Sequence, residues 1–443
     1  MMYVCLQHKT KTPCFLKRVM NSMEIKNTSK ISGFYKKSID ERVNLISSIA
    51  DLNNEEQSLL FSALEKGLAD RMIENVVGTF SLPLGIALNF RVNNEDVLIP
   101  MVTEESSVVA AASKAAKIAR THGGFRTEST DPVMIGQIQL LDVSDETTAA
   151  EQILNQKDRL LAVANVQDKI LTDLGGGAKD LAIRILNSSH GKMIVIHLYV
   201  DVRDAMGANA VNSMVEALAP VIEDITGGHV RLKILSNFAD QRLVTARAVF
   251  DKEMMGGENV VDAFLESVEL AKIDPYRAAT HNKGIMNGID AVIIATGNDF
   301  RAIEAGAHAF AARNGQYTSL TDYWKDETGH LVGEIKLPLA LGIVGGAGSI
   351  HPMAQVCKKI MNVTSAQTLA ERVASVGLAQ NFAAVLALST VGIQKGHMSL
   401  HAKNIAMMAG AEEVHIDRIA EQLIKEENVR LDRAKELVEQ LKK

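Results

Sequence analysis

Hydrophobic positions in the first third of the chain recur at helical spacing and then at strand spacing. Residues 38–68 carry leucine, isoleucine and valine three and four positions apart, which predicts helix. Residues 85–92 and 97–101 form two apolar runs joined by an asparagine pair, which indicates a strand hairpin. An alanine-rich stretch over 104–121 then predicts a helix that a glycine pair ends.

The middle of the chain predicts a compact unit within residues 132–236. The spacing of its apolar residues switches between the period of a strand and that of a helix. The resulting order, β-α-β-β-α-β, is that of a ferredoxin-like, split βαβ unit. The dinucleotide signature G-x-G-x-x-G is absent from its turns, so a Rossmann domain is not expected. The predicted elements are a strand at 133–143, a helix at 146–174, strands at 181–186 and 192–202, a helix at 208–225 and a strand from 230.

After Asn237 the pattern is mainly helical again. A short apolar run at 291–296 predicts a buried strand that feeds a helix starting near Asp299. A glycine-rich turn at 342–348 precedes another helix, and two amphipathic helices end the chain.

These patterns predict an α+β protein with four regions. Residues 23–131 and 237–390 would form a large, mainly helical domain into which the ferredoxin-like unit of 132–236 is inserted. Residues 391–443 would form a helical C-terminal segment. Residues 1–22 are expected to be disordered or a non-natural extension, because Met20 and Met23 are also plausible starts.

Composition narrows the class of protein further. Hydrophobic residues make up 47% and charged residues 23% of the 443, and the net charge is −6, which together exclude a disordered chain and give no sign of a nucleic-acid partner. Three cysteines are too few for a disulfide framework, so a reducing cytoplasm is expected. The runs at 291–297 and 337–348 are too short to cross a membrane, and the first residues contain no secretory signal.

Polar side chains at three places could carry acid–base chemistry. Glu104 and Glu105 open a predicted helix, where they could simply favour the helix dipole, or one could be a buried acid with a raised pKa. Lys283 lies in a predicted polar loop with Arg277, Asn282 and Asn287, and it could stabilise an oxyanion or be a solvated surface lysine. Asp299 is either a plain helix cap or a partner that keeps such a lysine charged.

Two further patterns remain open at this stage. His397 and His401 share a helix face, but Met398 stands where the zinc-protease motif requires glutamate, so no metal site is predicted and His397 could be a general acid. The turns at 201–209 and 345–348 could admit a phosphate or could be ordinary capped turns.

Seven segments in order, which span most of the chain from about Ser38, closely resemble 3-hydroxy-3-methylglutaryl-coenzyme A (HMG-CoA) reductase in its soluble bacterial, class II form. The segments are Glu74-Asn75-Val76-Val77-Gly78, Pro100 to Glu105, Asp204-Ala205-Met206-Gly207-Ala208-Asn209, Thr280 to Gly288, Gly297-Asn298-Asp299, Val344-Gly345-Gly346-Ala347 and Gly396-His397-Met398.

The resemblance implies an oxidoreductase of the mevalonate pathway. It would reduce HMG-CoA to mevalonate and coenzyme A with two NAD(P)H, through mevaldyl-CoA and mevaldehyde. Glu105 matches the family's catalytic glutamate, Lys283 its lysine, Asp299 its aspartate and His397 its histidine. The C-terminal segment with His397 resembles a mobile flap.

The resemblance also implies binding residues and an assembly. Ser107, Arg277, Asn287 and Glu74 match substrate-binding positions. Active sites would form at a dimer interface, in a homodimer or in a hexamer of three dimers. The positions that match the nicotinamide cofactor site are Asp204, Met206, Gly207, Asn209 and Asn237, and Asp168 matches a position where an acidic residue favours NADH over NADPH.

Some questions stay open on the sequence alone. Gly348 stands where the family usually has threonine. The same site could work oxidatively, in mevalonate catabolism, and a catalytically silent coenzyme A- or nucleotide-binding scaffold is the alternative from another class.

Overall fold

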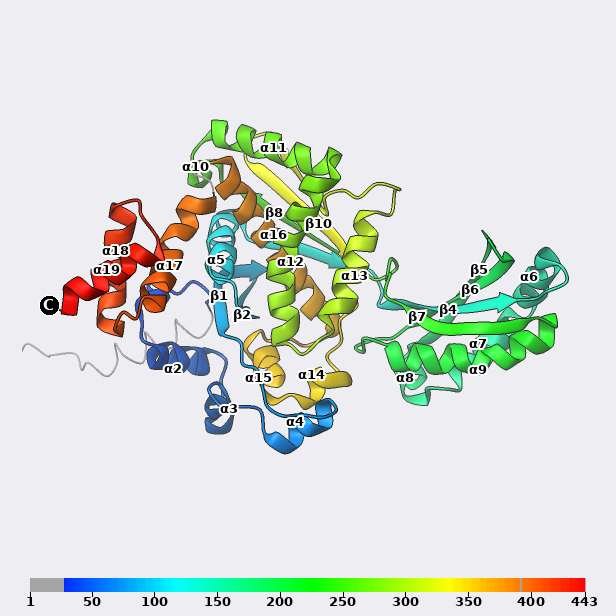
Figure 1. The fold of residues 1–443 in the computed structure, drawn as a ribbon. Helices are drawn as coiled ribbons and strands as arrows, with labels where there is room; N and C mark the ends of the chain where they lie inside the picture. Colours follow the sequence, from blue (N-terminus) through cyan, green and yellow to red (C-terminus); the bar gives the residue numbers. More distant parts are fainter. Residues whose placement is uncertain (1–27, 391–392, 443) are drawn as a thin grey trace, which may run out of the picture.

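The computed structural model describes residues 28–390 and 393–442 of the chain, except for the side chains of residues 347, 393–400 and 442. The prediction for residues 1–22 therefore lies outside the described residues. The larger body holds a six-stranded sheet, and a smaller body with a four-stranded sheet extends from one side of it (Figure 1). The fold is thus α+β, as predicted.

Short helices, rather than one long helix, open the larger body. The prediction of continuous helix over 38–68 is wrong because two capping boxes restart the helix. In each box the side chain of Ser38 or Asn53 accepts from the backbone three residues later, and a glutamate there reaches back. The elements are η1 (Phe34–Lys36), α2 (Ile39–Ile49), α3 (Asn54–Leu59) and α4 (Lys66–Met72).

The six-stranded sheet has the order β2-β1-β3-β8-β10-β9. The predicted hairpin is its β1–β2 pair, but the other four strands were not predicted. Strands β8 and β10 lie in a region expected to be mainly helical, and they pair antiparallel over eight residues each. The strands are β1 (Leu84–Val92), β2 (Glu95–Val102), β3 (Phe125–Ser129), β8 (Leu243–Phe250), β9 (Thr321–Lys325) and β10 (Leu331–Pro338).

The segment 275–295 is one long helix, which contradicts two predictions. Asp274 caps it and Pro275 occupies its first turn, so the polar residues around Lys283 are helical and do not form a loop. The apolar run 291–296 is its buried C-terminal turn, since a helix buried on several sides shows no amphipathic period. The helices of this body are α5 (Val108–Ala119), η2 (Arg120–His122), α10 (Lys252–Met255), α11 (Glu258–Ile273), α12 (Pro275–Ala295), α13 (Phe300–Ala311), α14 (Gly346–Ile350), α15 (Pro352–Ile360) and α16 (Ala366–Ser389).

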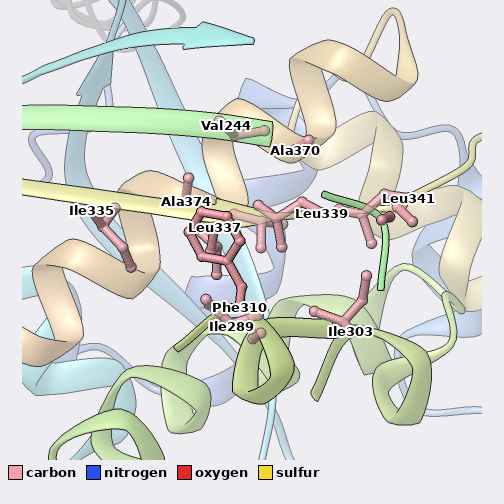
Figure 2. Packing of buried hydrophobic residues seen from close by; sticks show 14 of the residues in the cluster. Val244, Ile289, Ile303, Phe310, Ile335, Leu337, Leu339, Leu341, Ala370 and Ala374 are labelled. Carbon is pink, nitrogen blue, oxygen red and sulfur yellow. The ribbon is translucent and has the colours of Figure 1, made fainter. Parts of the chain in front are cut away.

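A hydrophobic core fixes α12 and α13 against the sheet. Figure 2 shows Ile289 of α12 and Phe310 of α13 beside Leu337 of β10. Ala370 and Ala374 of α16 belong to the same cluster of buried side chains. The two helices therefore have one apolar side facing the sheet, which leaves other sides for polar groups.

Among the described helices, only α16 is long and apolar enough to cross a membrane, and no such span was predicted. However, 72% of its most apolar window is buried inside the protein, as is typical of a core helix. It lies at the centre of the larger body (Figure 1).

The smaller body confirms the predicted ferredoxin-like unit. Its strands have the order β5-β6-β4-β7, and all neighbours are antiparallel. The predicted helix over 146–174 is broken into three, and a register shift in β7 places Leu232 on the face opposite Val230. The elements are β4 (Val133–Leu141), α6 (Glu146–Asn155), α7 (Lys157–Asn165), α8 (Lys169–Asp173), β5 (Gly177–Ser188), β6 (Gly191–Asp201), α9 (Ala208–Thr226) and β7 (His229–Ser236).

The C-terminal helices have a small core of their own. They are α17 (Ile393–Met408), α18 (Glu413–Lys425) and α19 (Leu431–Lys442). Ala402, Leu423 and Leu437 are among the buried residues that join them. This group lies at the opposite end of the large body from the four-stranded sheet (Figure 1).

Candidate active site

Glu105 lies in the turn between β2 and α5. Its backbone N–H donates to the hydroxyl of Thr103, 3.2 Å away. Two residues later, Ser107 adopts a left-handed conformation with φ of 77° and begins α5. The helix therefore starts after Glu105, and the prediction that Glu104 and Glu105 open it is wrong. The turn, rather than a helix dipole, sets the position of the Glu105 carboxylate.

Lys283 and Asn287 reach Glu105 from one face of α12. They are four residues apart, so they lie one helical turn above each other. Lys283 Nζ donates to Oε2 of Glu105 over 3.1 Å, and Asn287 Nδ2 donates to the same oxygen over 3.3 Å. Lys283 and Asn287 thus meet at one carboxylate oxygen of Glu105, although Glu105 precedes them in the chain by 178 and 182 positions.

The Glu105–Lys283 pair is open to solvent within one chain. The side chain of Glu105 is 41% exposed and that of Lys283 is 63% exposed. The burial that was expected around Glu105 is therefore not found in the described part of a single subunit. Exposed pairs of this kind are weak, about 0–1 kcal/mol, so the pair can open when a ligand arrives.

Asp299 begins α13, as predicted, although it follows a helix and not a strand. Its carboxylate accepts from the backbone N–H groups of Arg301 and Ala302, and it lies 3.4 Å from the Arg301 guanidinium. Within the described residues no hydrogen bond or ion pair joins Asp299 to Lys283. The predicted contact between them is thus not present in the single chain.

Two neighbours of Lys283 on α12 are structural. Asn282 is buried, donates to the carbonyl of Thr318 and accepts from the N–H of Leu320. His281 is also buried, and burial, followed by the nearby Arg277 charge, lowers its pKa to about 3. His281 is therefore neutral and does not qualify as an acid–base group at neutral pH.

Other predicted substrate residues lie farther from this contact or outside the description. Partial burial lowers the pKa of the Arg277 guanidinium, which does not share the face of Lys283 on α12. Glu74 is exposed and lies in a bend that follows α4. His397 lies in α17, but its side chain is outside the described residues.

The turn between β6 and α9 is shaped for a backbone-bound anion. Gly207 has φ of 100°, and a Cβ there would lie 2.5 Å from Val202. Helix α9 begins without a side-chain cap, so its first N–H groups stay free for a ligand. Met206 and Asn209 flank this start, and both are partly exposed.

Asp204 contributes to this turn differently from the prediction. Its carboxylate accepts from the N–H of Ala366, and its carbonyl accepts from the N–H of Ile343. The Asp204 side chain therefore ties the turn to α16, and its backbone carbonyl ties the turn to the glycine-rich segment. A Cβ at Gly342 would lie 2.5 Å from the N of Met206, so the two turns touch through their backbones.

The remaining predicted cofactor residues lie at two other places. Asp168 caps α8 and accepts from the N–H of Leu171 through one carboxylate oxygen. Asn237 is exposed after β7, and its carbonyl lies 2.7 Å from where a Cβ at Gly306 would be.

The structure explains why glycine occupies position 348. A Cβ there would lie 2.8 Å from the carbonyl oxygen of Thr296, and a Cβ at Gly297 would lie 2.6 Å from the Cα of Gly348. The two backbones therefore cross directly behind Asp299. Sequence reasoning noted both glycines but had no signal for their contact.

One histidine cluster has the residue types of a metal site. His122, Asp251 and His330 bring their ligand atoms within 4.8 Å of one another. However, His122 Nε2 lies 3.0 Å from Asp251, and Nδ1 of His330 accepts from the N–H of Lys252. Since hydrogen bonds already use these atoms, the cluster is satisfied without an ion.

Comparisons with known proteins decide the family. The family model described as hydroxymethylglutaryl-coenzyme A reductase matches residues 38–402. This chain belongs to that family. It is 53% identical over 416 residues to the 3-hydroxy-3-methylglutaryl-coenzyme A reductase of Archaeoglobus fulgidus, which covers 94% of this chain and 95% of that protein.

Solved reductase structures have the same fold. A reductase from Streptococcus pneumoniae superposes with a TM-score of 0.80 at 42% identity, covering 93% of this chain and 99% of that one. The class II reductase of the same organism, bound to NADPH in open conformations, gives a TM-score of 0.78 at 42% identity, over 92% and 100% of the two chains.

Proposed function

We propose that this reductase converts HMG-CoA to mevalonate and coenzyme A with two molecules of NAD(P)H. The observation that carries the proposal is the convergence of Lys283 and Asn287 on Glu105. A cation, an amide and a carboxyl group around one point suit a carbonyl that gains negative charge and then a proton. Family membership supplies the substrate that fits this chemistry.

Each catalytic residue has a defined task in this proposal. Bound NAD(P)H supplies a hydride in each of the two reductions. Lys283 donates to the carbonyl oxygen and stabilises the oxyanion that develops on mevaldyl-CoA. As the carbon–sulfur bond breaks, His397 gives a proton to the coenzyme A thiolate. Glu105 then protonates the oxygen of mevaldehyde as it becomes the alcohol of mevalonate.

Asp299, Ser107, Arg277 and Asn287 complete the proposed site. Asp299 would hold the ammonium of Lys283 charged once the site closes around substrate. Arg277 has a guanidinium suited to the carboxylate of the hydroxymethylglutaryl group, and Ser107 and Asn287 would bind its oxygens.

The proposed cofactor site lies at the turn from β6 to α9. The free N–H groups after Gly207 would bind the pyrophosphate, with Asp204, Met206, Asn209 and Asn237 around it. We propose NADH as the preferred cofactor. One oxygen of Asp168 caps α8, which leaves the other to accept from a ribose hydroxyl and to repel a 2′-phosphate.

We also propose a homodimer, or a hexamer of three such dimers, with Glu74 reaching the partner's site. The segment after α4 supports this because it exposes apolar side chains that a second subunit would cover. Ile73 is 65% exposed, Phe80 is 90% exposed and Val77 is fully exposed. Light scattering during size-exclusion chromatography should give at least twice the monomer mass. A cytoplasmic location belongs to the same proposal and suits the free, buried thiol of Cys357.

A paired assay tests the function. Purified protein should oxidise NADH when HMG-CoA is added, and should do so faster than NADPH at equal, subsaturating concentrations. Asp168→Ala should lower the ratio of the NADH rate to the NADPH rate about tenfold, since it removes one charged hydrogen bond to the cofactor. Failure to turn over either nucleotide, in either direction, would exclude the reductase.

A further inference from the structure

Two positively charged side chains are buried where the β6–α9 turn meets the glycine-rich segment of residues 342–348. Arg242, directly before β8, is 5% exposed, and Lys358 of α15 is 7% exposed. Within the part of the chain that the structure describes, neither side chain forms an ion pair with a carboxylate, and both donate to backbone carbonyls instead. Since a buried charge needs polar partners, these hydrogen bonds are costly to break. The proposed reaction uses neither residue.

Arg242 joins the two segments through its fork of N–H groups. Nη1 donates to the carbonyl of Ala205 over 3.0 Å, and Nη2 donates to the carbonyl of Leu341 over 2.5 Å. Ala205 lies in the β6–α9 turn shortly before Gly207, and Leu341 directly precedes the glycine-rich segment. Burial lowers the pKa of Arg242 only to about 10, so the guanidinium stays charged at neutral pH. One rigid, planar group thus fixes two backbones at once.

Lys358 holds the glycine-rich segment near both of its ends. Its Nζ donates to the carbonyl of Ile343 over 3.2 Å and to that of Gly348 over 3.1 Å. The side-chain amide of Gln355, also on α15, donates to the Gly348 carbonyl as well, over 2.9 Å. One ammonium can bind both carbonyls only if the segment between them curls. Residues 345–346 are glycines with φ of 71° and 64°, which allow that curl.

The glycine-rich segment in turn contacts both the β6–α9 turn and the start of α13. The N–H of Ile343 donates to the carbonyl of Asp204 in the turn over 2.9 Å. The N–H of Gly342 donates over 2.8 Å to Oδ1 of Asn298, the residue before Asp299. Hydrogen bonds therefore run without a break from the β6–α9 turn, through the glycine-rich segment, to the residue that precedes the candidate catalytic aspartate. Movement of the segment would shift the turn relative to that aspartate.

We propose that Arg242 and Lys358 are positioning residues, whose buried charges hold the β6–α9 turn in a fixed place relative to Asp299. The free N–H groups after Gly207 then stay where the cofactor and the catalytic residues can share one site. Charged donors suit this task, because a charge-assisted hydrogen bond is about twice as strong as a neutral one. This inference rests on the proposed function and goes beyond it, since neither residue belongs to the proposed catalytic or cofactor-binding set.

Steady-state kinetics of Arg242→Lys tests the proposal. Lysine keeps the charge but cannot hold both carbonyls with a rigid fork. We expect the KM for NADH to rise about tenfold, as for the loss of one charged hydrogen bond, while the KM for HMG-CoA stays near wild type. Lys358→Met, which lacks a donor, should also raise the KM for NADH. Arg120→Lys is the matched control, because Arg120 also donates to a backbone carbonyl, that of Asn89 in β1, and it should leave both KM values unchanged.

Hydrogen–deuterium exchange gives a readout that needs neither cofactor nor activity. In the ligand-free protein, peptides that contain the Ile343 N–H should exchange faster in both variants than in wild type, because its bond to the Asp204 carbonyl opens more often. Arg120→Lys should match wild type there. Unchanged exchange at Ile343 in either variant would overturn the proposal, as would an unchanged KM for NADH in Arg242→Lys or an equal rise in both of its KM values. If wild type fails to reduce HMG-CoA, the proposed function fails, while the exchange still decides whether the two cations hold the turn.

Discussion

The two ends of one face of α12 hold their acidic groups in different surroundings. At one end, Lys283 meets Glu105 in a pair whose side chains are 63% and 41% exposed. At the other end, burial and then the neighbouring Glu304 raise the pKa of Asp290, and the Glu304 carboxylate lies 2.7 Å from His308, which also contacts Tyr317. Charged groups in water exchange partners at little cost, whereas buried ones are fixed by the penalty of losing a partner.

This difference separates two tasks within one helix. Groups that must bind a carbonyl and release a product benefit from weak, open contacts. Groups that hold the geometry benefit from contacts that are costly to break. The residues between the two ends, Asn287 above all, connect a reactive region to a rigid one.

Removal of Lys283 should have the largest effect on activity and almost none on stability. Lys283→Ala should lower kcat by about 10²–10³-fold or more, as for the loss of one oxyanion donor. Its free energy of unfolding should change by about 1 kcal/mol or less, because the pair with Glu105 is exposed. Steady-state kinetics and urea unfolding measure the two quantities.

Lys272→Ala is the control for this variant, because Lys272 also forms a partly exposed ion pair, with Asp322, outside α12. It should leave both kcat and stability near wild type. If Lys283→Ala retained most of the wild-type kcat, the solvent-exposed end of α12, where Lys283 meets Glu105, would not be the reactive one.

A methyl group at position 348 should disturb the rigid end. Gly348→Ala places a Cβ 2.8 Å from the carbonyl oxygen of Thr296, a backbone atom that cannot move alone. We expect a loss of about 1–3 kcal/mol in the free energy of unfolding, as for an overpacked core. A fall in kcat should accompany it, since Asp299 follows this crossing.

Gly284→Ala is the matched control for stability. No atom lies within 4 Å of a Cβ at that position, which is in the interior of α12. Alanine should therefore stabilise the helix by up to about 1 kcal/mol. Equal stability of Gly348→Ala and wild type would show that the crossing of the two backbones is not tight.

The sequence predicted the smaller body best, for a physical reason. Its strands are half-buried or follow glycine turns, so their period and their ends are visible in the residues themselves. The order of elements then defines the sheet, and the strand order β5-β6-β4-β7 agrees with it. The hairpin at β1 and β2 was visible on the same basis.

Burial on several sides hid much of the larger body. Residues 291–296 looked like a strand because the last turns of α12 are apolar all round. Glu105 was placed in a predicted helix, with burial as one of two alternatives, whereas it lies exposed in a turn where its N–H bonds Thr103. The candidate catalytic residues were assigned through resemblance to a family, and the meeting of Glu105 with Lys283 depends on contacts that no local pattern encodes.

The partly buried carboxyl of Asp290 should also make stability depend on pH, with a sign opposite to that of most carboxylates. An ordinary aspartate in the unfolded chain releases its proton near pH 3.9, but burial raises the pKa of Asp290 in the folded protein. Between these two values the folded state holds one proton more than the unfolded state. The free energy of unfolding contributed by Asp290 therefore falls as the pH rises.

Comparison of wild type with Asp290→Asn isolates this small contribution. Urea unfolding at intervals from pH 5 to pH 8 should show Asp290→Asn gaining stability relative to wild type as the pH increases, because other titrating groups cancel in the difference. Asp322→Asn should show no such trend, since its carboxylate is exposed. If the difference in the free energy of unfolding between wild type and Asp290→Asn stayed constant with pH, the acidic groups at both ends of this α12 face would be ionised alike. The contrast between the two ends of α12 would then disappear.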